Sequence, residues 1–311
     1  MAAEVESMFY TGRETPWHGL GTMVEEAPDS REALLMAGLD WEVVQKNVYT
    51  QDGFLISGYR ANVRLQDDKI LGVVTERYKV VQNREAFAFT DQLLESGVRY
   101  ETAGSLQGGR KTWLLARLPE KYIINGDQIM PYLVFSNTHD GSGSIKIAMT
   151  PIRVVCNNTL NLALRSADRI WSANHTGNME VKMEDARETL FRAEDYMTGL
   201  GDAFATLSQK KLTDAAVNEY ISMLLPVADD ASETTERNVR KLRDDMLKRY
   251  MYAPDLIHVE RNGYRFINAV ADFATHAKPL RETKNYRENL FSKTMEGNPM
   301  TDKAYQIVMA A

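Results

Sequence analysis

The chain has 311 residues, of which 44% are hydrophobic and 26% are charged, and its formal net charge is −6. A chain of this length and composition is long enough to bury one large core or two smaller ones. The acidic balance argues against a protein that coats nucleic acid by bulk attraction. No apolar run approaches the roughly 20 residues that a membrane-spanning helix needs, so we expect no membrane partner.

Charge is distributed unevenly along the chain. Residues 1–50 contain nine acidic and three basic residues, whereas residues 145–171 contain four basic residues and one acid. A local basic groove is therefore compatible with the acidic total, although the same charges also fit scattered solvated side chains. The single cysteine, Cys156, excludes an internal disulfide and a zinc site built on cysteines. Because the first residues also lack the apolar core of a signal peptide, we expect a cytoplasmic protein.

The first elements in the chain are an arm and a short helix. Residues 1–28 are rich in glycine, proline and charge, which predicts an arm without a core of its own. Asp29 or Ser30 can then cap a short helix through residues 31–39.

Strand-like runs dominate the next part of the chain. The clearest run is 57–66, in which apolar residues alternate with Arg60, Asn62 and Arg64. A helix through 84–97, with Asn83 as its N-cap, interrupts the series after the third run. The predicted strands are 41–50, 57–66, 70–81, 100–107, 111–118, 132–139 and 144–152. Sequential short strands with few helices between them favour an antiparallel meander covered by helices in an α+β fold.

The character of the sequence changes near residue 180, after which apolar residues recur at helical spacing. Helices are predicted through 180–209, 212–225, 232–252 and 266–277, and near the C-terminus. The predicted domains are therefore an arm (1–28), an α+β core (29–178) and a mostly α-helical domain (179–311).

Catalytic chemistry finds little support in the sequence. Cys156 as a nucleophile would need a base such as His139 or His175, yet no papain-like signature surrounds it. A lone cysteine after two valines is typical of a small buried side chain.

Metal and nucleotide chemistry are equally poorly supported. His139 and Asp140, together with His175 or His18, could ligate a metal, but no His-x-x-x-His pattern is present. The glycines of residues 104–112 lack the spacing of a phosphate-binding loop and predict a hairpin turn. We therefore expect no enzyme activity, no metal and no cofactor, and the sequence leaves the roles of Cys156, His18 and His139 open.

The segment 150–171 predicts a binding scaffold. Asn157 or Asn158 can cap a helix that begins near Thr159 and runs through residues 160–170, and on that helix Arg165 and Arg169 share a face. The capped helix N-terminus attracts anions, and Arg153 on the preceding strand can point to the same place. In the alternative interpretation, the asparagines only cap the helix and the arginines pair with acids.

Several segments resemble the phage/plasmid-like protein family, a family defined by a domain of unknown function. They are TPWHGLGT, GVVTERYKVVQNREAF, SNTHDGSGSIKIAMTPIRVVCNNTLNLAL, RFINAVADFATHA and NLFSKTMEGNPMTDKAYQIV. The resemblance covers most of the chain and implies a phage or plasmid origin, and hence the cytoplasm of an infected or plasmid-bearing cell. The order of three strands and a helix through residues 41–97 is also similar to the core of the Redβ, RecT and Rad-type single-strand annealing proteins.

The second resemblance implies a basic groove for single-stranded DNA and assembly of the chain into rings or filaments. In such a groove, a set of basic residues would contact phosphates, and Tyr78 or Trp171 would stack on a base. The basic residues are Arg60, Arg64, Arg77, Lys79, Arg110, Lys111, Lys146, Arg153, Arg165 and Arg169. We therefore predict a protein of phage or plasmid recombination or replication that binds single-stranded DNA and anneals strands without ATP. The alternative is a host-takeover or anti-defence interaction protein with no nucleic-acid role, which the net negative charge and the long charged helices favour.

Overall fold

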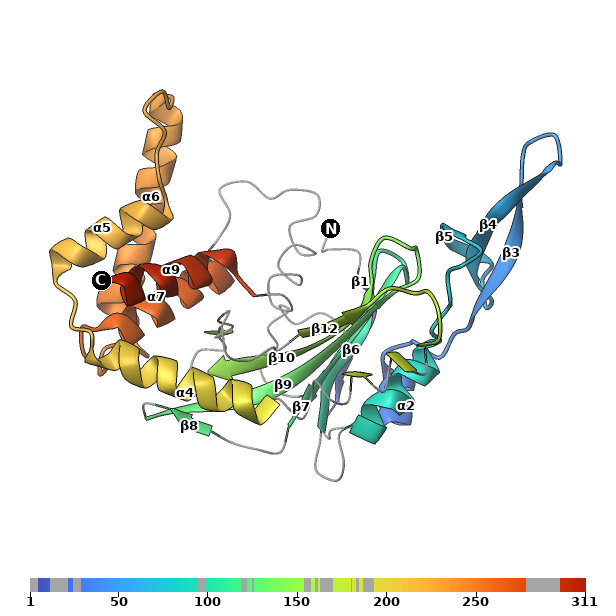
Figure 1. Cartoon of the computed structure of the whole chain (residues 1–311), viewed down its shortest axis with the longest axis horizontal. Helices are drawn as coiled ribbons and strands as arrows, with labels where there is room; N and C mark the ends of the chain where they lie inside the picture. Colours follow the sequence, from blue (N-terminus) through green and yellow to red (C-terminus); the bar gives the residue numbers. More distant parts are fainter. Residues whose placement is uncertain are drawn as a thin grey trace. The chain divides into compact units, whose positions relative to one another are not determined.

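The computed structural model describes residues 5–11, 22–24, 29–93, 99–118, 122–124, 126–153, 158–159, 162, 170–179, 181–182, 185–186, 193–277 and 297–311. The fold is α+β, as predicted, with antiparallel sheets in the N-terminal part and helices in the C-terminal half (Figure 1). The chain forms two compact units. Unit 1 comprises Met1–Pro119, Tyr132–Met149 and Arg169–Ala193, and unit 2 comprises Glu120–Pro131, Thr150–Asp168 and Glu194–Ala311.

The first helix of unit 1, α1 (Ser30–Met36), begins at the predicted cap. The Asp29 side chain accepts a hydrogen bond from the Glu32 amide at 2.7 Å, and the Glu32 side chain accepts one from the Asp29 amide. This reciprocal pair is a capping box, which satisfies two amides that the first helical turn leaves without partners. Of the two residues predicted as possible caps, Asp29 is the N-cap and Ser30 is the first residue of the helix.

A three-stranded antiparallel meander follows, as predicted, formed by β3 (Val43–Tyr49), β4 (Leu55–Arg64) and β5 (Lys69–Thr75). β3 and β4 form a long hairpin in Figure 1. β5 ends at Thr75 and does not run on to residue 81, because Glu76 and Arg77 turn the chain and the Tyr78 amide bonds back to the Thr75 carbonyl.

Helix α2 (Asn83–Leu93) comes next, but its cap differs from the prediction. Asn83 is the first helical residue, and its side chain is turned away from the helix amides. Its Nδ2 donates to the Leu39 carbonyl at 3.0 Å, and its Oδ1 lies 2.9 Å from His139 Nε2. The Gln82 amide instead donates to the Glu85 side chain. The prediction of Asn83 as N-cap is therefore wrong, because tertiary partners compete for its amide group.

The larger sheet of unit 1 packs against the segments around helices α1 and α2. Its strands there are β1 (Val5–Thr11), β2 (Thr22–Val24), β6 (Arg99–Leu106), β7 (Lys111–Arg117), β9 (Asp127–Thr138), β10 (Ile145–Arg153) and β12 (Ile170–Ala173). Their order is β10-β9-β7-β6-β1-β2, with β12 on β10. β1 and β2 pair in parallel, whereas the pairs β1–β6, β6–β7, β7–β9 and β10–β12 are antiparallel. The predicted arm thus contributes the two strands β1 and β2.

Two tight connections join strands of this sheet, and the first is the hairpin turn that the sequence predicts. Residues 107–110 join β6 to β7, with positive φ at Gln107, Gly108 and Gly109. In the connection between β9 and β10, the Asp140 carboxylate accepts hydrogen bonds from the amide and hydroxyl of Ser142. This is the Asx-type turn expected for an Asp-Gly sequence.

The hydrophobic core of unit 1 lies between the larger sheet and the segments around α1 and α2. Leu114, Leu133 and Phe135 from the sheet pack in one cluster with Leu34 and Phe87 from the two helices. This burial is the main favourable contribution to the stability of the unit.

Unit 2 is mainly helical. Its described helices are α4 (Ala193–Gln209), α5 (Asp214–Leu224), α6 (Glu233–Tyr252), α7 (Gly263–His276) and α9 (Pro299–Ala310), where α4 begins at the boundary residue Ala193. Two short strands, β8 (Tyr122–Ile124) and β11 (Asn158–Thr159), pair with β9 and β10. None of the helices in the described part of the chain combines the length and the apolar character needed to cross a bilayer.

The helix predicted from Thr159 is contradicted at its start. Asn158 and Thr159 form β11, where they pair with Arg153 and Ile152 of β10. Ile170, predicted as the end of the same helix, begins β12. The strand partner, which sequence periodicity does not reveal, overrides the local capping signal here. Residues 160–161 and 163–169 lie outside the described residues.

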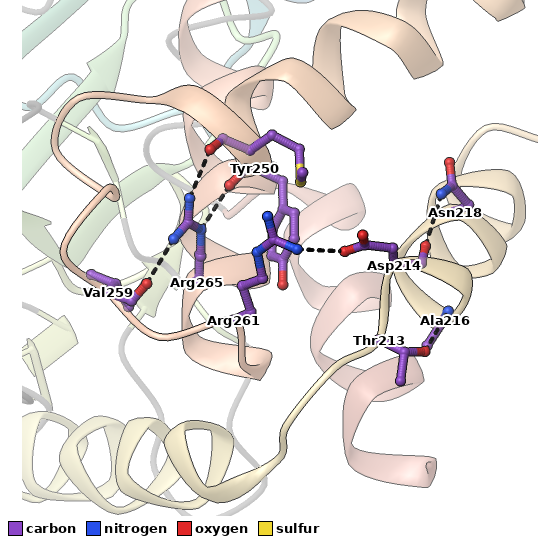
Figure 2. Close-up of polar contacts among 9 residues, drawn as sticks. Thr213, Asp214, Ala216, Asn218, Tyr250, Val259, Arg261 and Arg265 are labelled. Carbon is purple, nitrogen blue, oxygen red and sulfur yellow. Dashed lines mark hydrogen bonds and ion pairs between the residues drawn. The ribbon is translucent and has the colours of Figure 1, made fainter.

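Arg265 joins the helices of unit 2 through its buried guanidinium group (Figure 2). Its three nitrogens donate to the carbonyls of Tyr250, Met251 and Val259 at 2.7–2.9 Å. Two of these carbonyls belong to the last turn of α6, where helix carbonyls have no partner within the helix. Arg265 also lies over the Tyr250 ring, so one side chain both caps α6 and packs against it.

The contact between β5 and the β9–β10 connection gives the first testable prediction. A Cβ atom at Gly72 would lie 2.6 Å from the Asp140 Cα, so Gly72→Ala forces two main-chain segments apart. We expect this variant to lose about 2 kcal/mol or more of unfolding free energy in urea titrations. Gly201→Ala is the matched control, because Gly201 lies within α4 with no atom within 4 Å of its Cβ position. It should stabilise the protein by about 0.5–1 kcal/mol. A Gly72→Ala variant as stable as the parent would contradict the close approach.

Candidate nucleic-acid interface

The structure describes the side chains of seven of the ten predicted basic residues. These are Arg60, Arg64, Arg77, Lys79, Arg110, Lys111 and Lys146. The side chain of Arg153 and the residues Arg165 and Arg169 lie outside the described part, as do Cys156 and His18.

Arg64 is buried and its charge is already paired. Its Nε and Nη2 donate to the two carboxylate oxygens of Asp67 at 2.9 and 2.6 Å, and its guanidinium lies 5.4 Å from the centre of the Trp41 ring. The hydrogen bond from Arg64 lowers the pKa of Asp67 to about 2, so this pair stays ionised at every physiological pH. Arg64 thus closes the β4–β5 turn, and it has little capacity left for a phosphate.

Four other predicted residues are half-buried on strands. Lys111 is the first residue of β7, where it stands opposite Thr138 of β9. Arg60 donates to the carbonyl of its neighbour Tyr59. Lys146 lies on β10 opposite Ser172 of β12, and burial lowers its pKa. Trp171 stands opposite Ile147 and packs against the core of unit 1, so only part of its ring is exposed.

Tyr78 is buried and its contacts are structural. Its hydroxyl donates to the Thr138 carbonyl, and its ring is stacked on His175 with the ring centres 4.5 Å apart. Burial raises the pKa of Tyr78, and the nearby Asp140 raises it further. The predicted role of Tyr78 in stacking on a base requires an exposed ring, which this packing does not provide.

The end of β9 is the place where three segments of unit 1 meet. We call the stretch Thr138–His139 the β9 junction. The His139 amide donates to the Arg110 carbonyl at 2.7 Å, and the His139 carbonyl accepts from Asn62 Nδ2 at 2.7 Å. The Thr138 carbonyl accepts from Tyr78, as described above. The β6–β7 turn, strand β4 and the linker between β5 and α2 are therefore all anchored on two residues.

The ring of His139 is held in one tautomer. Because Asn83 Nδ2 donates to a carbonyl, its Oδ1 faces His139 Nε2, which must then carry the hydrogen. The His139 side chain is fully buried, and its Nδ1 has no hydrogen-bond partner among the described residues. Burial lowers the pKa of His139 to about 3, and the neighbouring His175 lowers it as well. His139 is therefore a neutral structural residue near pH 7.

Three exposed cations lie on segments that the β9 junction anchors. Arg77 and Lys79 flank Tyr78, which binds Thr138, whereas Arg110 contributes the carbonyl that binds His139. All three basic side chains are exposed. The four residues Lys69, Arg77, Lys79 and Arg110 are called the anchored basic set below.

Lys69 joins this set through the β6–β7 turn. Its Nζ lies 2.2 Å from the Cβ position of Gly108, so the Lys69 side chain rests on that turn beside Arg110. Sequence reasoning missed Lys69, which reads as an ordinary residue of the β4–β5 turn. It also missed the junction, because nothing in the sequence tells which residues contact Thr138 and His139.

Three of the residues named in the metal hypothesis, His139, His175 and Asp140, do converge on this region, whereas His18 lies outside the described residues. His175 interacts electrostatically with both His139 and Asp140. However, the residues that the structure describes include no group of three or more His, Cys, Asp or Glu side chains able to hold a metal ion.

Tyr78→Phe tests the anchoring role of the tyrosine hydroxyl. The variant keeps the stacked ring but leaves the buried Thr138 carbonyl without its partner, which should cost about 1–3 kcal/mol of unfolding free energy. Tyr252→Phe is the matched control, because Tyr252 is 72% exposed. Equal unfolding free energies for the two variants in chemical denaturation would show that the hydroxyl anchors nothing.

Comparison with known proteins identifies a family but not a function. No curated protein and no solved structure matches the chain significantly. One family model, described as "Domain of unknown function (DUF932)", matches residues 70–294. The matched region begins in β5, includes the β9 junction and covers more than half of the chain. The chain therefore belongs to the DUF932 family.

Proposed function

We propose that this protein binds single-stranded DNA and anneals complementary strands without ATP, in the recombination or replication of a phage or plasmid. The observation that carries the proposal is the anchored basic set, whose members lie on β5, on the following linker and at the β6–β7 turn, segments that the β9 junction and its neighbouring turn hold in place. The order β3-β4-β5-α2 supports it, because three strands followed by a helix is the element order on which the expected similarity to the single-strand annealing proteins rests.

Cations of this kind bind nucleic acid through phosphates. Phosphate contacts fix the position of a strand and carry no base preference, and they become weaker as salt rises. A strand held by its backbone keeps its bases free to pair with a complement. Annealing therefore needs only an extended, neutralised strand, for which no nucleotide hydrolysis is required.

The local charge agrees with this proposal better than the total charge does. Residues 43–79 contain six basic and four acidic residues, in a chain whose net charge is −6. Two of these acids, Asp67 and Asp68, form ion pairs with Arg64 and Lys46 and lie at the β4–β5 turn. The charges that remain in this segment are Arg60, Lys69, Arg77 and Lys79 against Asp52 and Glu76, a local excess of two positive charges.

The remaining predicted residues extend the proposal. Arg60, Lys111 and Lys146 would flank the anchored basic set, and Arg153, Arg165, Arg169 and Trp171 stay predictions for the same strand path. Assembly into a homo-oligomer would place several such sets in series, which raises affinity for a long strand through linked binding events.

Fluorescence anisotropy with a labelled, mixed-sequence single strand of about 40 nucleotides tests the proposal. The parent protein should bind at low salt, prefer the single strand to duplex, and lose affinity steeply as salt rises. The triple variant Arg77→Glu, Lys79→Glu, Arg110→Glu should bind at least about tenfold more weakly. Its salt slope should be smaller by about 2, because each lost phosphate contact contributes roughly 0.7 for a single strand.

The matched control reverses three exposed cations on α6, through Arg237→Glu, Arg240→Glu and Lys241→Glu. It changes the net charge by the same amount, so it should keep the parent affinity and salt slope. An equal loss in both triple variants would show bulk attraction in place of a site. No binding by the parent at low salt would refute the proposed function.

A second candidate is a protein that binds a host protein and has no nucleic-acid role. It is favoured by the exposed apolar side chains of the meander, with exposed fractions from 47% to 71%. These are Tyr49, Phe54, Leu55, Tyr59, Leu65, Ile70 and Val73. Apolar surface gathered in this way is typical of protein interfaces. Failure of the parent to bind DNA, together with stoichiometric capture of one host protein through this surface, would favour the second candidate.

A further inference from the structure

The loop of residues 174–178, which follows β12, is fastened to the linker between β5 and α2 by one histidine. The Lys79 amide donates to the His175 carbonyl at 2.7 Å, and His175 Nδ1 lies 3.0 Å from the Lys79 carbonyl. The imidazole is also stacked on Tyr78. We call residues 174–178 the latch loop, because these contacts all pass through His175.

The contacts of His175 fix its tautomer. A carbonyl oxygen only accepts hydrogen bonds, so Nδ1 carries the hydrogen and Nε2 carries a bare lone pair. His175 is 3% exposed, and its Nε2 has no partner in the part of the chain that the structure describes. The closed loop therefore accommodates a neutral imidazole only.

A proton on Nε2 would convert this arrangement into an unfavourable one. The imidazolium would place a full charge and a second N–H donor in a buried position where the described residues offer no acceptor. Both are costly away from water. If the loop detaches, water solvates the cation and the ring returns to the ordinary behaviour of an exposed histidine.

We propose that His175 is an acid-sensitive latch, whose protonation releases the latch loop from the Tyr78–Lys79 linker at mildly acidic pH while the core of unit 1 stays folded. This inference does not depend on DNA binding. Opening would free the Lys79 main chain and so change the position of one member of the anchored basic set.

Burial and the charged groups around His175 determine the direction in which its pKa is shifted. Burial lowers its pKa, the hydrogen bond to the Lys79 carbonyl opposes this, Lys182 lowers the pKa further and Asp140 raises it. Lys182 is bonded to the latch loop itself, because its Nζ donates to the Asn174 and Thr176 carbonyls. His139 and the Tyr78 ring complete the surroundings. The net result is a pKa below the ordinary value of about 6.5.

Whether acid opens or closes the latch loop follows from the linkage between protonation of His175 and opening of the loop. The open loop binds a proton below about pH 6.5, whereas the closed loop binds one only at lower pH. Opening is therefore favoured as pH falls below 6.5, by up to about tenfold per pH unit, until the pH reaches the pKa of the closed state. His139 remains neutral in this window, since its pKa is about 3, and the β9 junction is preserved.

Amide hydrogen exchange of the full-length protein tests the latch. The Lys79 amide is the reporter, because the latch loop supplies its acceptor. After correction for the intrinsic pH dependence of exchange, its protection should fall between pH 7.5 and pH 5, by up to about tenfold per unit below 6.5. The His139 amide, bonded to Arg110 within the same unit, should keep its protection over this range.

His175→Phe keeps an aromatic ring on Tyr78 but cannot be protonated, so its Lys79 protection should not depend on pH in this window. His258→Phe is the matched control, because His258 is exposed in unit 2, and it should behave as the parent does. The same pH dependence in His175→Phe as in the parent would overturn the proposal, as would constant protection in the parent. If His175→Phe does not fold, an NMR titration of the parent decides. The His175 ring must then titrate with the same midpoint as the loss of Lys79 protection, and a separate midpoint would refute the latch.

Discussion

Strand β9 carries polar main-chain and side-chain groups into the interior of unit 1, and their burial is the constraint on which the rest of that unit depends. Buried donors and acceptors must find partners, since each one left unpaired costs about 1–3 kcal/mol. The carbonyls of Thr138 and His139 accept from Tyr78 and Asn62, and the His139 amide donates to the Arg110 carbonyl. The apolar core drives the collapse, but these directional bonds decide which strand, turn and linker meet at the end of β9.

The same constraint positions the candidate interface. A cation on a mobile loop meets a phosphate only at the cost of ordering the loop, whereas cations held on anchored segments avoid part of that cost. Arg77, Lys79 and Arg110 belong to segments that the β9 junction holds in place. Arg64 differs from them, because its pairing with Asp67 keeps it within the fold. The distinction between structural and available cations comes from partner geometry, which the residue type alone does not reveal.

The sequence predicts local features well and tertiary partners poorly. Alternation along residues 57–66 predicted β4, and the Asp29 cap predicted α1, because both signals depend on neighbours in the chain. Asn83 was predicted to cap α2, yet its side chain forms hydrogen bonds with the Leu39 carbonyl and the His139 ring. A helix was predicted to start near Thr159, yet Thr159 lies in β11 and pairs with Ile152 of β10. Tyr78 was chosen as an exposed aromatic residue, and its burial follows from contacts with residues about 60 and 97 positions away.

The central claim is that the polar β9 junction organises unit 1, and a double-mutant cycle between Asn83 and His139 tests it most directly. The unfolding free energies of Asn83→Ala, His139→Ala and the double variant would be measured by urea titration at pH 7. We predict non-additive losses with a coupling energy of about 1–3 kcal/mol, because each single variant leaves the other side chain buried without its hydrogen-bond partner. Additive losses would show that the two side chains only fill space, and that apolar packing alone organises the unit.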